Sequence, residues 1–153
     1  MALKNVSKIS IAKEKQIIIN YESIYSTPLN YEKWVEYIEN HNDYYTWYEN
    51  SIDGIETKEN IDLIPERFQE RILKRLNKRT ANAEFEQKEK YFKVILEFFD
   101  DSNYIRVTTT KPTIERLEKL LDLANYLDAL LLINGKKIVD KIFLETQKTH
   151  KDV

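Results

Sequence analysis

The sequence predicts an α+β protein with a mainly antiparallel sheet and about three helices packed on it. Segments with β-strand character come in pairs separated by short turns, and segments with one apolar helical face lie between those pairs. The strongest turn signal is Asn134-Gly135, which favours a tight hairpin. At 153 residues the chain is long enough to bury a sizeable core, so we expect residues 1–153 to form one domain.

The N-terminal part is predicted to contain two strands, a helix and a third strand. Residues 6–12 and 16–21 are rich in isoleucine and flank a Lys-Glu-Lys turn. A helix then begins near Pro28 and ends near residues 40–42. Its apolar side chains share one face, at Tyr31, Trp34, Val35 and Ile38. The aromatic run at 44–49 has the character of a short strand.

The middle of the chain is predicted to form a loop, a second helix and a hairpin. Residues 50–63 are acidic and irregular, with a turn at Gly54. Pro65 can open a helix, because its missing N–H has no partner in the first turn. The side chains expected to face inward are Phe68, Ile72, Leu73 and Leu76. Alternating apolar residues at 91–99 and β-branched residues at 104–110 then predict a hairpin.

The C-terminal part predicts a helix on the sheet followed by two strands. A helix begins after Thr113, and its apolar residues cover about half of its circumference, as in a helix packed on a sheet. The apolar run 129–133 predicts a strand buried on both faces, so that the preceding strand, the helix and this strand fit a βαβ crossover. The hairpin partner spans 136–139. Beyond Asp140 the pattern fits a strand or a short helix, and a disordered tail is expected from about residue 148.

The composition indicates a cytoplasmic protein. The chain has no cysteine, which fits a reducing compartment and excludes thiol nucleophiles and zinc–thiolate sites. No apolar run is long enough for a signal-peptide core or for a span of about 18 residues. Only two glycines are present, which disfavours glycine-rich phosphate loops.

No residue pattern in the sequence predicts catalysis, and we expect no enzymatic activity, no metal and no cofactor. His41 follows a predicted helix, where a histidine complements the helix dipole, and His150 lies near the C-terminus. Neither histidine has a second ligand at metal-binding spacing. The adjacent carboxylates Asp100 and Asp101 fit a solvated turn better than a catalytic pair.

Negative charge and aromatic side chains concentrate in residues 21–66. Eleven acids against two lysines give this segment a net charge of −9, whereas the whole chain carries −2. Tyr and Trp anchor protein interfaces, and acidic charge steers a basic partner. The run 44–49 fits either an exposed face or ordinary packing, because alternate strand residues point to opposite sides. The predicted partner-binding residues are Glu32, Glu36, Glu39, Asp43, Tyr44, Tyr45, Trp47, Tyr48 and Glu49.

Positive charge follows directly, with a net charge of +5 over residues 67–93. Its clearest element is a basic stripe on the second predicted helix, formed by Arg67, Arg71, Lys74 and Lys78. This stripe is the one candidate for nucleic-acid binding. A solvated helix face is the stronger interpretation, because the sequence pI of 5.8 is far below the value of about 9 found in nucleic-acid-binding domains.

A small, cysteine-free chain with an acidic aromatic surface and no catalytic set resembles the immunity proteins of bacterial toxin systems. The residues that carry this resemblance are Glu32, Glu36, Glu39, Asp43, Tyr44 and Trp47. The resemblance implies a non-enzymatic cytosolic protein that binds a cognate toxin, often a basic nuclease, and occludes its active site without a membrane or nucleic-acid partner. Three alternatives stay open: a nucleic-acid-associated regulator that uses the basic stripe, a scaffold with another partner, and an enzyme built from ordinary Asp, Glu and Tyr residues.

Overall fold

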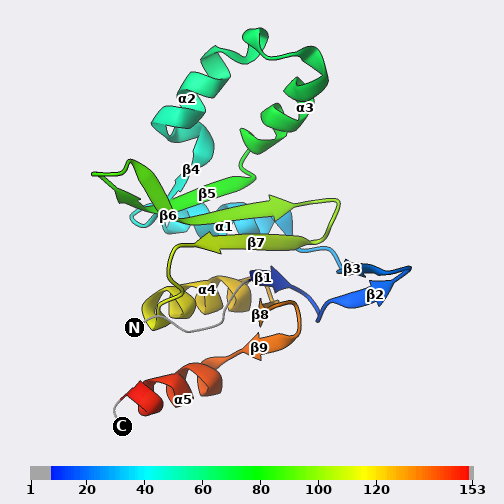
Figure 1. Cartoon of the computed structure of the whole chain (residues 1–153), viewed down its shortest axis with the longest axis vertical. Helices are drawn as coiled ribbons and strands as arrows, with labels where there is room; N and C mark the ends of the chain where they lie inside the picture. The colour runs from blue at the N-terminus through cyan, green and yellow to red at the C-terminus, as the bar shows by residue number, and fades with distance from the viewer. Residues whose placement is uncertain (1–7, 152–153) are drawn as a thin grey trace.

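A seven-stranded antiparallel sheet forms the centre of the computed structural model, which describes residues 8–151 (Figure 1). The strands lie in the spatial order β4-β5-β6-β7-β1-β8-β9. In chain order they are β1 (Ile9–Ala12), β4 (Tyr45–Trp47), β5 (Thr80–Glu86), β6 (Tyr91–Phe99), β7 (Tyr104–Thr109), β8 (Leu130–Ile133) and β9 (Lys137–Val139). Residues 6 and 7 of the first predicted strand lie outside the described residues.

The helices are more numerous than the sequence predicted. Within residues 8–151 they are α1 (Tyr31–Asn40), α2 (Ile52–Glu59), α3 (Glu66–Arg75), α4 (Ile114–Tyr126) and α5 (Lys141–Lys151), with short 3₁₀ turns η1 (Tyr48–Asn50) and η2 (Ile61–Leu63). The α+β class with a large antiparallel sheet is confirmed, and the count of about three helices is wrong. Helix α5 runs past residue 148, where we expected disorder, and residues 152–153 lie outside the described residues.

One face of the sheet carries the main hydrophobic core. Ile9, Val107 and Leu96 lie opposite one another on adjacent strands and are buried on this face. Helices α1 and α4 cover it, each with an apolar stripe against the strands. The buried stripe residues are Trp34, Tyr37 and Ile38 of α1 and Ile114, Leu117, Leu120, Leu123 and Ala124 of α4. The predicted packing of the helix after Thr113 on the sheet is confirmed.

Strand β8 is buried on both faces, as its unbroken apolar sequence predicts. Leu131 and Ile133 belong to the main core, whereas Leu132 belongs to a smaller cluster with Ala12 and Tyr25 on the opposite face. Both β7 and β8 pair antiparallel with β1, so they run parallel to each other with β1 between them. Helix α4 connects β7 to β8, which confirms the predicted βαβ crossover. The two strands are not neighbours in the sheet, because β1 lies between them. The predicted hairpin of β8 and β9 is also confirmed.

Strand β5 was missed because its sequence is poor in strand formers. Ala81, Asn82 and Ala83 are all buried, and they pair with β4 on one side and β6 on the other. The pairing partners, rather than local propensity, make this segment a strand. The sequence offers only an indirect signal for β5. The predicted hairpin of β6 and β7 pairs one edge of β6, so its other edge needs a further antiparallel strand.

The predicted irregular loop at 50–63 is wrong, because most of it forms α2. The backbone N–H of Gly54 donates a hydrogen bond of 3.1 Å to the hydroxyl of Ser51, which caps the helix. Gly54 sits in the first turn of α2 and is not a loop turn. A Cβ on Gly54 would lie 2.6 Å from the carbonyl carbon of Tyr48 and closer still to its oxygen, so glycine permits α2 to approach η1.

Helix α3 forms, but its apolar side chains do not enter the core as predicted. Phe68 and Leu73 are exposed, Ile72 and Leu76 are half-buried, and no residue of α3 is fully buried. The core face of the sheet is already occupied by α1 and α4, so α3 has no apolar surface to cover. Figure 1 shows α2 and α3 extending beyond the β4–β5 end of the sheet. We call residues 48–79, which connect β4 to β5, the helical excursion.

The first of the two predicted isoleucine-rich strands joins the main sheet as β1, whereas the second forms part of a separate arm. β2 (Ile17–Ile19) pairs with β3 (Glu22–Ile24), and this hairpin extends away from the main sheet (Figure 1). Asn20 and Tyr21 connect them with φ angles of 50° and 66°, the two positive values of a type I′ turn. All three β2 isoleucines and Tyr21 are exposed.

We expect Gly54→Ala to lower the free energy of unfolding by about 1–3 kcal/mol, because the added methyl group overlaps the Tyr48 carbonyl and forces α2 away from η1. Urea denaturation measures the change. The control is Lys58→Ala, an exposed position on the same helix, which should change stability by less than about 0.5 kcal/mol. Equal stability of the two variants would contradict the close packing of α2 on η1.

Candidate protein-interaction site

The predicted acids of α1 lie together on its outer surface. Glu32, Glu36 and Glu39 follow spacings of four and three residues, so they share one helix face, and all three are exposed. Asp43 is exposed in the turn that follows α1. The opposite side of the helix buries its apolar stripe in the core. The structure therefore brings Glu32, Glu36 and Glu39 to one face of α1, with the exposed Asp43 just beyond its end, and we call these four residues the acidic face.

The acidic face is only partly neutralised by its neighbours. Glu39 lies 3.5 Å from the Lys78 ammonium, in an exposed ion pair. The neighbouring Glu36 carboxylate raises the pKa of the Tyr126 hydroxyl on α4. Glu32 and Asp43 have no ion-pair partner within the described part of the chain.

Residues at the two ends of α1 determine where the helix begins and ends. The side chain of Asn30 accepts a hydrogen bond of 3.1 Å from the backbone N–H of Lys33, so Asn30 caps the helix rather than the predicted start near Pro28. At the other end α1 stops at Asn40, as predicted. His41 stacks on Tyr37 with ring centroids 4.0 Å apart, and its Nδ1 lies 2.7 Å from the Tyr37 carbonyl oxygen.

Two of the predicted aromatic anchors are core residues. Tyr45 and Trp47 point from β4 into the main core, where only 3% and 7% of their surface stays exposed. The Trp47 ring packs edge-on against Trp34 at a centroid distance of 5.8 Å. Thr46, between them, is the β4 residue that faces solvent. Direct surface docking by Tyr45 and Trp47 is therefore excluded in this structure, because alternation along β4 turns both rings inward.

The remaining predicted site residues, Tyr48 and Glu49, hold the helical excursion. Tyr48 is half-buried, with its hydroxyl 3.3 Å from the Thr57 hydroxyl and the Arg75 guanidinium 4.8 Å above its ring. Glu49 accepts a hydrogen bond of 2.7 Å from the backbone N–H of Lys78, which joins the two ends of the excursion. Both residues lie beside the acidic face but have structural contacts of their own.

A shallow hollow of about 290 Å³ adjoins the acidic face. It opens between the end of α1, β4 and η1. Four side chains with oxygen acceptors line it, namely Glu39, Asn42, Thr46 and Asn50. Tyr45 and Trp47 also contribute to its lining, although both rings are buried in the core. Sequence reasoning selected both rings, although as surface residues.

A polar network around Tyr44 was not predicted. Glu84 of β5 receives two hydrogen bonds from the forked guanidinium of Arg116, at 2.8 and 3.0 Å, and a third of 2.6 Å from the Tyr44 hydroxyl. The Lys119 ammonium lies 4.2 Å above the Tyr44 ring. Glu84 has a positive φ of 57°, which is uncommon for a side-chain-bearing residue in a strand. These contacts join β5 to the start of α4, and the Arg116 guanidinium holds the pKa of Glu84 below its ordinary value.

Three tyrosines in the same region are held in the neutral form. Burial raises the pKa of Tyr37, Tyr44 and Tyr45. Hydrogen bonds to carboxylates raise it further in two cases, from Tyr37 to Asp122 at 2.8 Å and from Tyr44 to Glu84. The buried Tyr45 hydroxyl has no hydrogen-bond partner among the described residues. A tyrosine that resists ionisation is a poor general base near neutral pH, so this network is suited to linking α1, β4 and α4.

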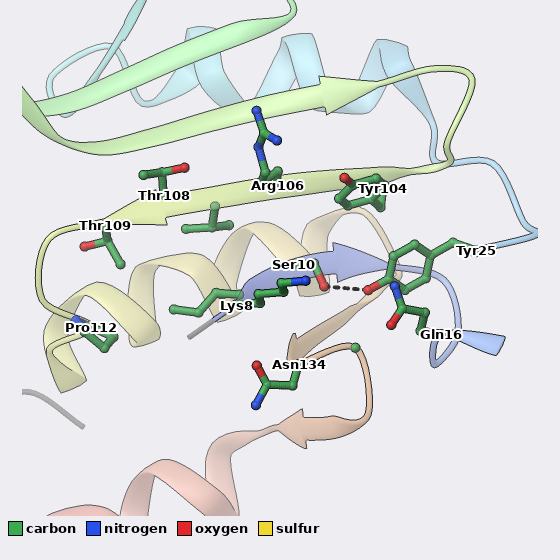
Figure 2. A pocket seen from close by; sticks show the side chains of 13 residues that line it. Lys8, Ser10, Gln16, Tyr25, Tyr104, Arg106, Thr108, Thr109, Pro112 and Asn134 are labelled. Carbon is green, nitrogen blue, oxygen red and sulfur yellow. Dashed lines mark hydrogen bonds between the residues drawn. The ribbon is translucent and has the colours of Figure 1, made fainter. Parts of the chain in front are cut away.

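A second, larger hollow lies on the face of the sheet that α1 and α4 leave uncovered. It has a volume of about 360 Å³ and is lined by polar side chains including Lys8, Gln16 and Thr108 (Figure 2). The Ser10 and Tyr25 hydroxyls are 2.8 Å apart at its side. Arg106 also lines the hollow, but its guanidinium donates to Glu97 at 2.8 Å. The signal for this polar face is alternation in β7, whose even-numbered residues are polar.

The basic residues proposed for nucleic-acid binding do not form one free row. Helix α3 ends at Arg75, so Lys78 lies beyond it and pairs with Glu39. Lys74 pairs with Asp101 at 3.3 Å. Arg67 and Arg71 remain exposed on α3, beside the ring of Phe68. The stripe is thereby divided between the helix and the start of β5.

Comparisons with protein-family models, curated proteins and solved structures found no match for this chain. Within residues 8–151, no three His, Asp or Glu residues gather where they could hold a metal ion. No helix in that range has the length and apolar character needed to cross a membrane.

Glu84→Gln should weaken the acid dependence of stability. The pKa of Glu84 is lowered in the folded protein, so its stabilising contribution is present above the unfolded pKa of about 4.5 and is lost as pH falls through the lower folded value. Denaturant unfolding across pH 7 to about 3 should therefore show a shallower fall for Glu84→Gln than for the natural chain. Glu115→Gln, at an exposed neighbouring position, is the control. Parallel pH profiles for all three proteins would contradict the role of the Arg116 ion pair.

Trp47→Ala should lower the free energy of unfolding by about 3–5 kcal/mol, because it removes a buried ring that packs on Trp34. Thermal melts of the free protein measure the loss. Thr46→Ala, at the adjacent exposed position, should have little effect. An unchanged melting temperature for Trp47→Ala would mean that this ring is not part of the core.

Proposed function

We propose that this chain is a non-enzymatic immunity protein that binds a cognate bacterial toxin domain with a basic surface and covers its active site. The observation that carries the proposal is the acidic face on α1 together with the adjoining hollow. A carboxylate surface attracts the cationic groups that a nuclease-type toxin uses to hold phosphates. Covering those groups stops substrate binding and needs no chemistry by the immunity protein.

The spacing of the acids suits an extended basic surface. Neighbouring helix-face positions lie about 5–6 Å apart, so Glu32, Glu36 and Glu39 can contact several cations at once. Glu39 is held by Lys78 in an exposed ion pair, which is worth at most about 1 kcal/mol. An arginine or lysine of the partner can replace Lys78 at little cost, while Glu32 and Asp43 meet no competing cation within the described residues.

The hollow suits a single inserted cationic side chain. Acceptor oxygens of Asn42, Thr46 and Asn50 can receive hydrogen bonds from a guanidinium, and Glu39 supplies the opposing charge. An arginine fits this set of acceptors better than a lysine, because its planar fork bonds several acceptors at once.

The acidic face is rigid before binding. Asn30 caps α1, and its buried stripe anchors the helix on the sheet. A preformed surface loses little conformational freedom on association, so more of the interaction energy contributes to affinity. This rigidity favours fast capture of a toxin over folding upon binding.

The direct test reverses charge on the acidic face. The variant Glu32→Lys, Glu36→Lys and Asp43→Lys should bind the cognate toxin at least about 10-fold more slowly at low salt and lose most of the salt dependence of association. It should also fail to protect cells that express the toxin. The fold should survive, because all three positions are exposed.

The matched control reverses three exposed acids elsewhere, with Glu22→Lys, Glu89→Lys and Glu145→Lys. Both triple variants carry the same net charge, so a general charge effect would impair both equally. The proposal expects the control to bind and protect like the natural chain. Equal loss in both variants, or full protection by the acidic-face variant, would contradict it.

A further inference from the structure

The helical excursion exposes apolar side chains that no described element covers. Ile52 of α2 is 73% exposed and Leu63 of η2 is 82% exposed. Ile55, Phe68 and Leu73 are also exposed on α2 and α3. Both helices extend beyond the end of the sheet (Figure 1), away from the core that buries α1 and α4. Several large apolar side chains exposed on neighbouring elements of this kind are typical of an interaction site.

Helix α2 carries an apolar stripe flanked by acids. Gly54 faces η1, so the opposite side of α2 faces away from the body of the molecule. Ile52, Ile55, Glu56 and Glu59 are three, four and seven residues apart and share that outward side. Three acids against one lysine give α2 a net charge of −2.

Helix α3 carries an apolar stripe flanked by bases. The exposed Phe68 and the half-buried Ile72 are four residues apart, and Arg67 and Arg71 follow the same spacing beside them. The guanidinium groups of Arg67 and Arg71 lie 4.7 and 5.8 Å from the Phe68 ring centroid. Four bases against two acids give α3 a net charge of +2, equal and opposite to that of α2.

We propose that the helical excursion is a dimerisation surface, in which α2 of one copy packs on α3 of a second copy. A two-fold axis places the same patch on both partners, so the acidic α2 meets the basic α3 twice. The apolar stripes of the four helices then cover one another. A partner of uniform charge would be repelled by one of the two helices, which favours a second copy of this chain. The surface does not include the acidic face.

Light scattering after size-exclusion chromatography, over a wide range of protein concentration, tests the proposal. The natural chain should have the mass of a dimer and dissociate on dilution. Glu56→Lys with Glu59→Lys makes both helices basic, whereas Arg67→Glu with Arg71→Glu makes both acidic. Each double variant should be monomeric at concentrations where the natural chain is dimeric. An equimolar mixture of the two should recover a dimer, because each basic helix then meets an acidic one.

A second pair of variants tests the apolar contact. Ile52→Ser with Leu63→Ser should abolish the dimer and leave the melting temperature of the monomer unchanged, since both side chains are exposed. Ile18→Ser with Ile142→Ser removes isoleucines that are 66% and 76% exposed at other places and should leave the dimer intact.

Three results would overturn the proposal. The first is a natural chain that stays monomeric at every concentration, even if a foreign protein binds the excursion. The second is a dimer that survives in either charge-reversed variant. The third is a dimer that is lost in the Ile18 and Ile142 control but kept in the Ile52 and Leu63 variant.

Discussion

The fully buried indole of Trp34 joins the acidic helix to the sheet, and the position of the proposed site depends on it. Its Nε1 donates a hydrogen bond of 2.9 Å to the carbonyl oxygen of Lys78, two residues before β5. Its ring packs edge-on against Trp47 of β4 and at 5.6 Å from Phe98 of β6. One side chain thus fixes α1 against β4, β6 and the end of the helical excursion, and this contact sets the orientation of the exposed acids of α1.

The charged segments of the chain form two different kinds of surface in the folded structure. The acids of α1 lie on a rigid helix over the main core, where they offer a surface of one sign. The acids of α2 lie in the helical excursion, beside the bases of α3 and next to exposed apolar side chains. The first arrangement suits a basic partner, and the second is self-complementary. The net charge of residues 21–66 counts the acids of both surfaces together, so it cannot distinguish one surface from the other.

The sequence predicted elements whose apolar pattern matches their burial. The stripe of α1, the hairpin of β6 and β7, and the doubly buried β8 all follow from periodicity. The predictions were wrong where contacts between distant segments determine the local structure. Ala81 and Ala83 join the sheet through their neighbours, Gly54 serves close packing rather than a turn, and the apolar face of α3 has no core to enter. For the site, the exposure of Glu32, Glu36 and Glu39 followed from helix periodicity, whereas the hollow and the Glu84 network required contacts between distant segments.

Hydrogen–deuterium exchange on the complex with the toxin tests the central claim most directly. The claim is that the acidic face and the adjoining hollow contact the toxin. Amide protection on binding should appear at the exposed turn after α1 and along β4 and η1, with the β2–β3 arm and α5 unchanged. Protection confined to the β2–β3 arm or to the polar hollow on the other sheet face, with residues 40–50 unaffected, would contradict it.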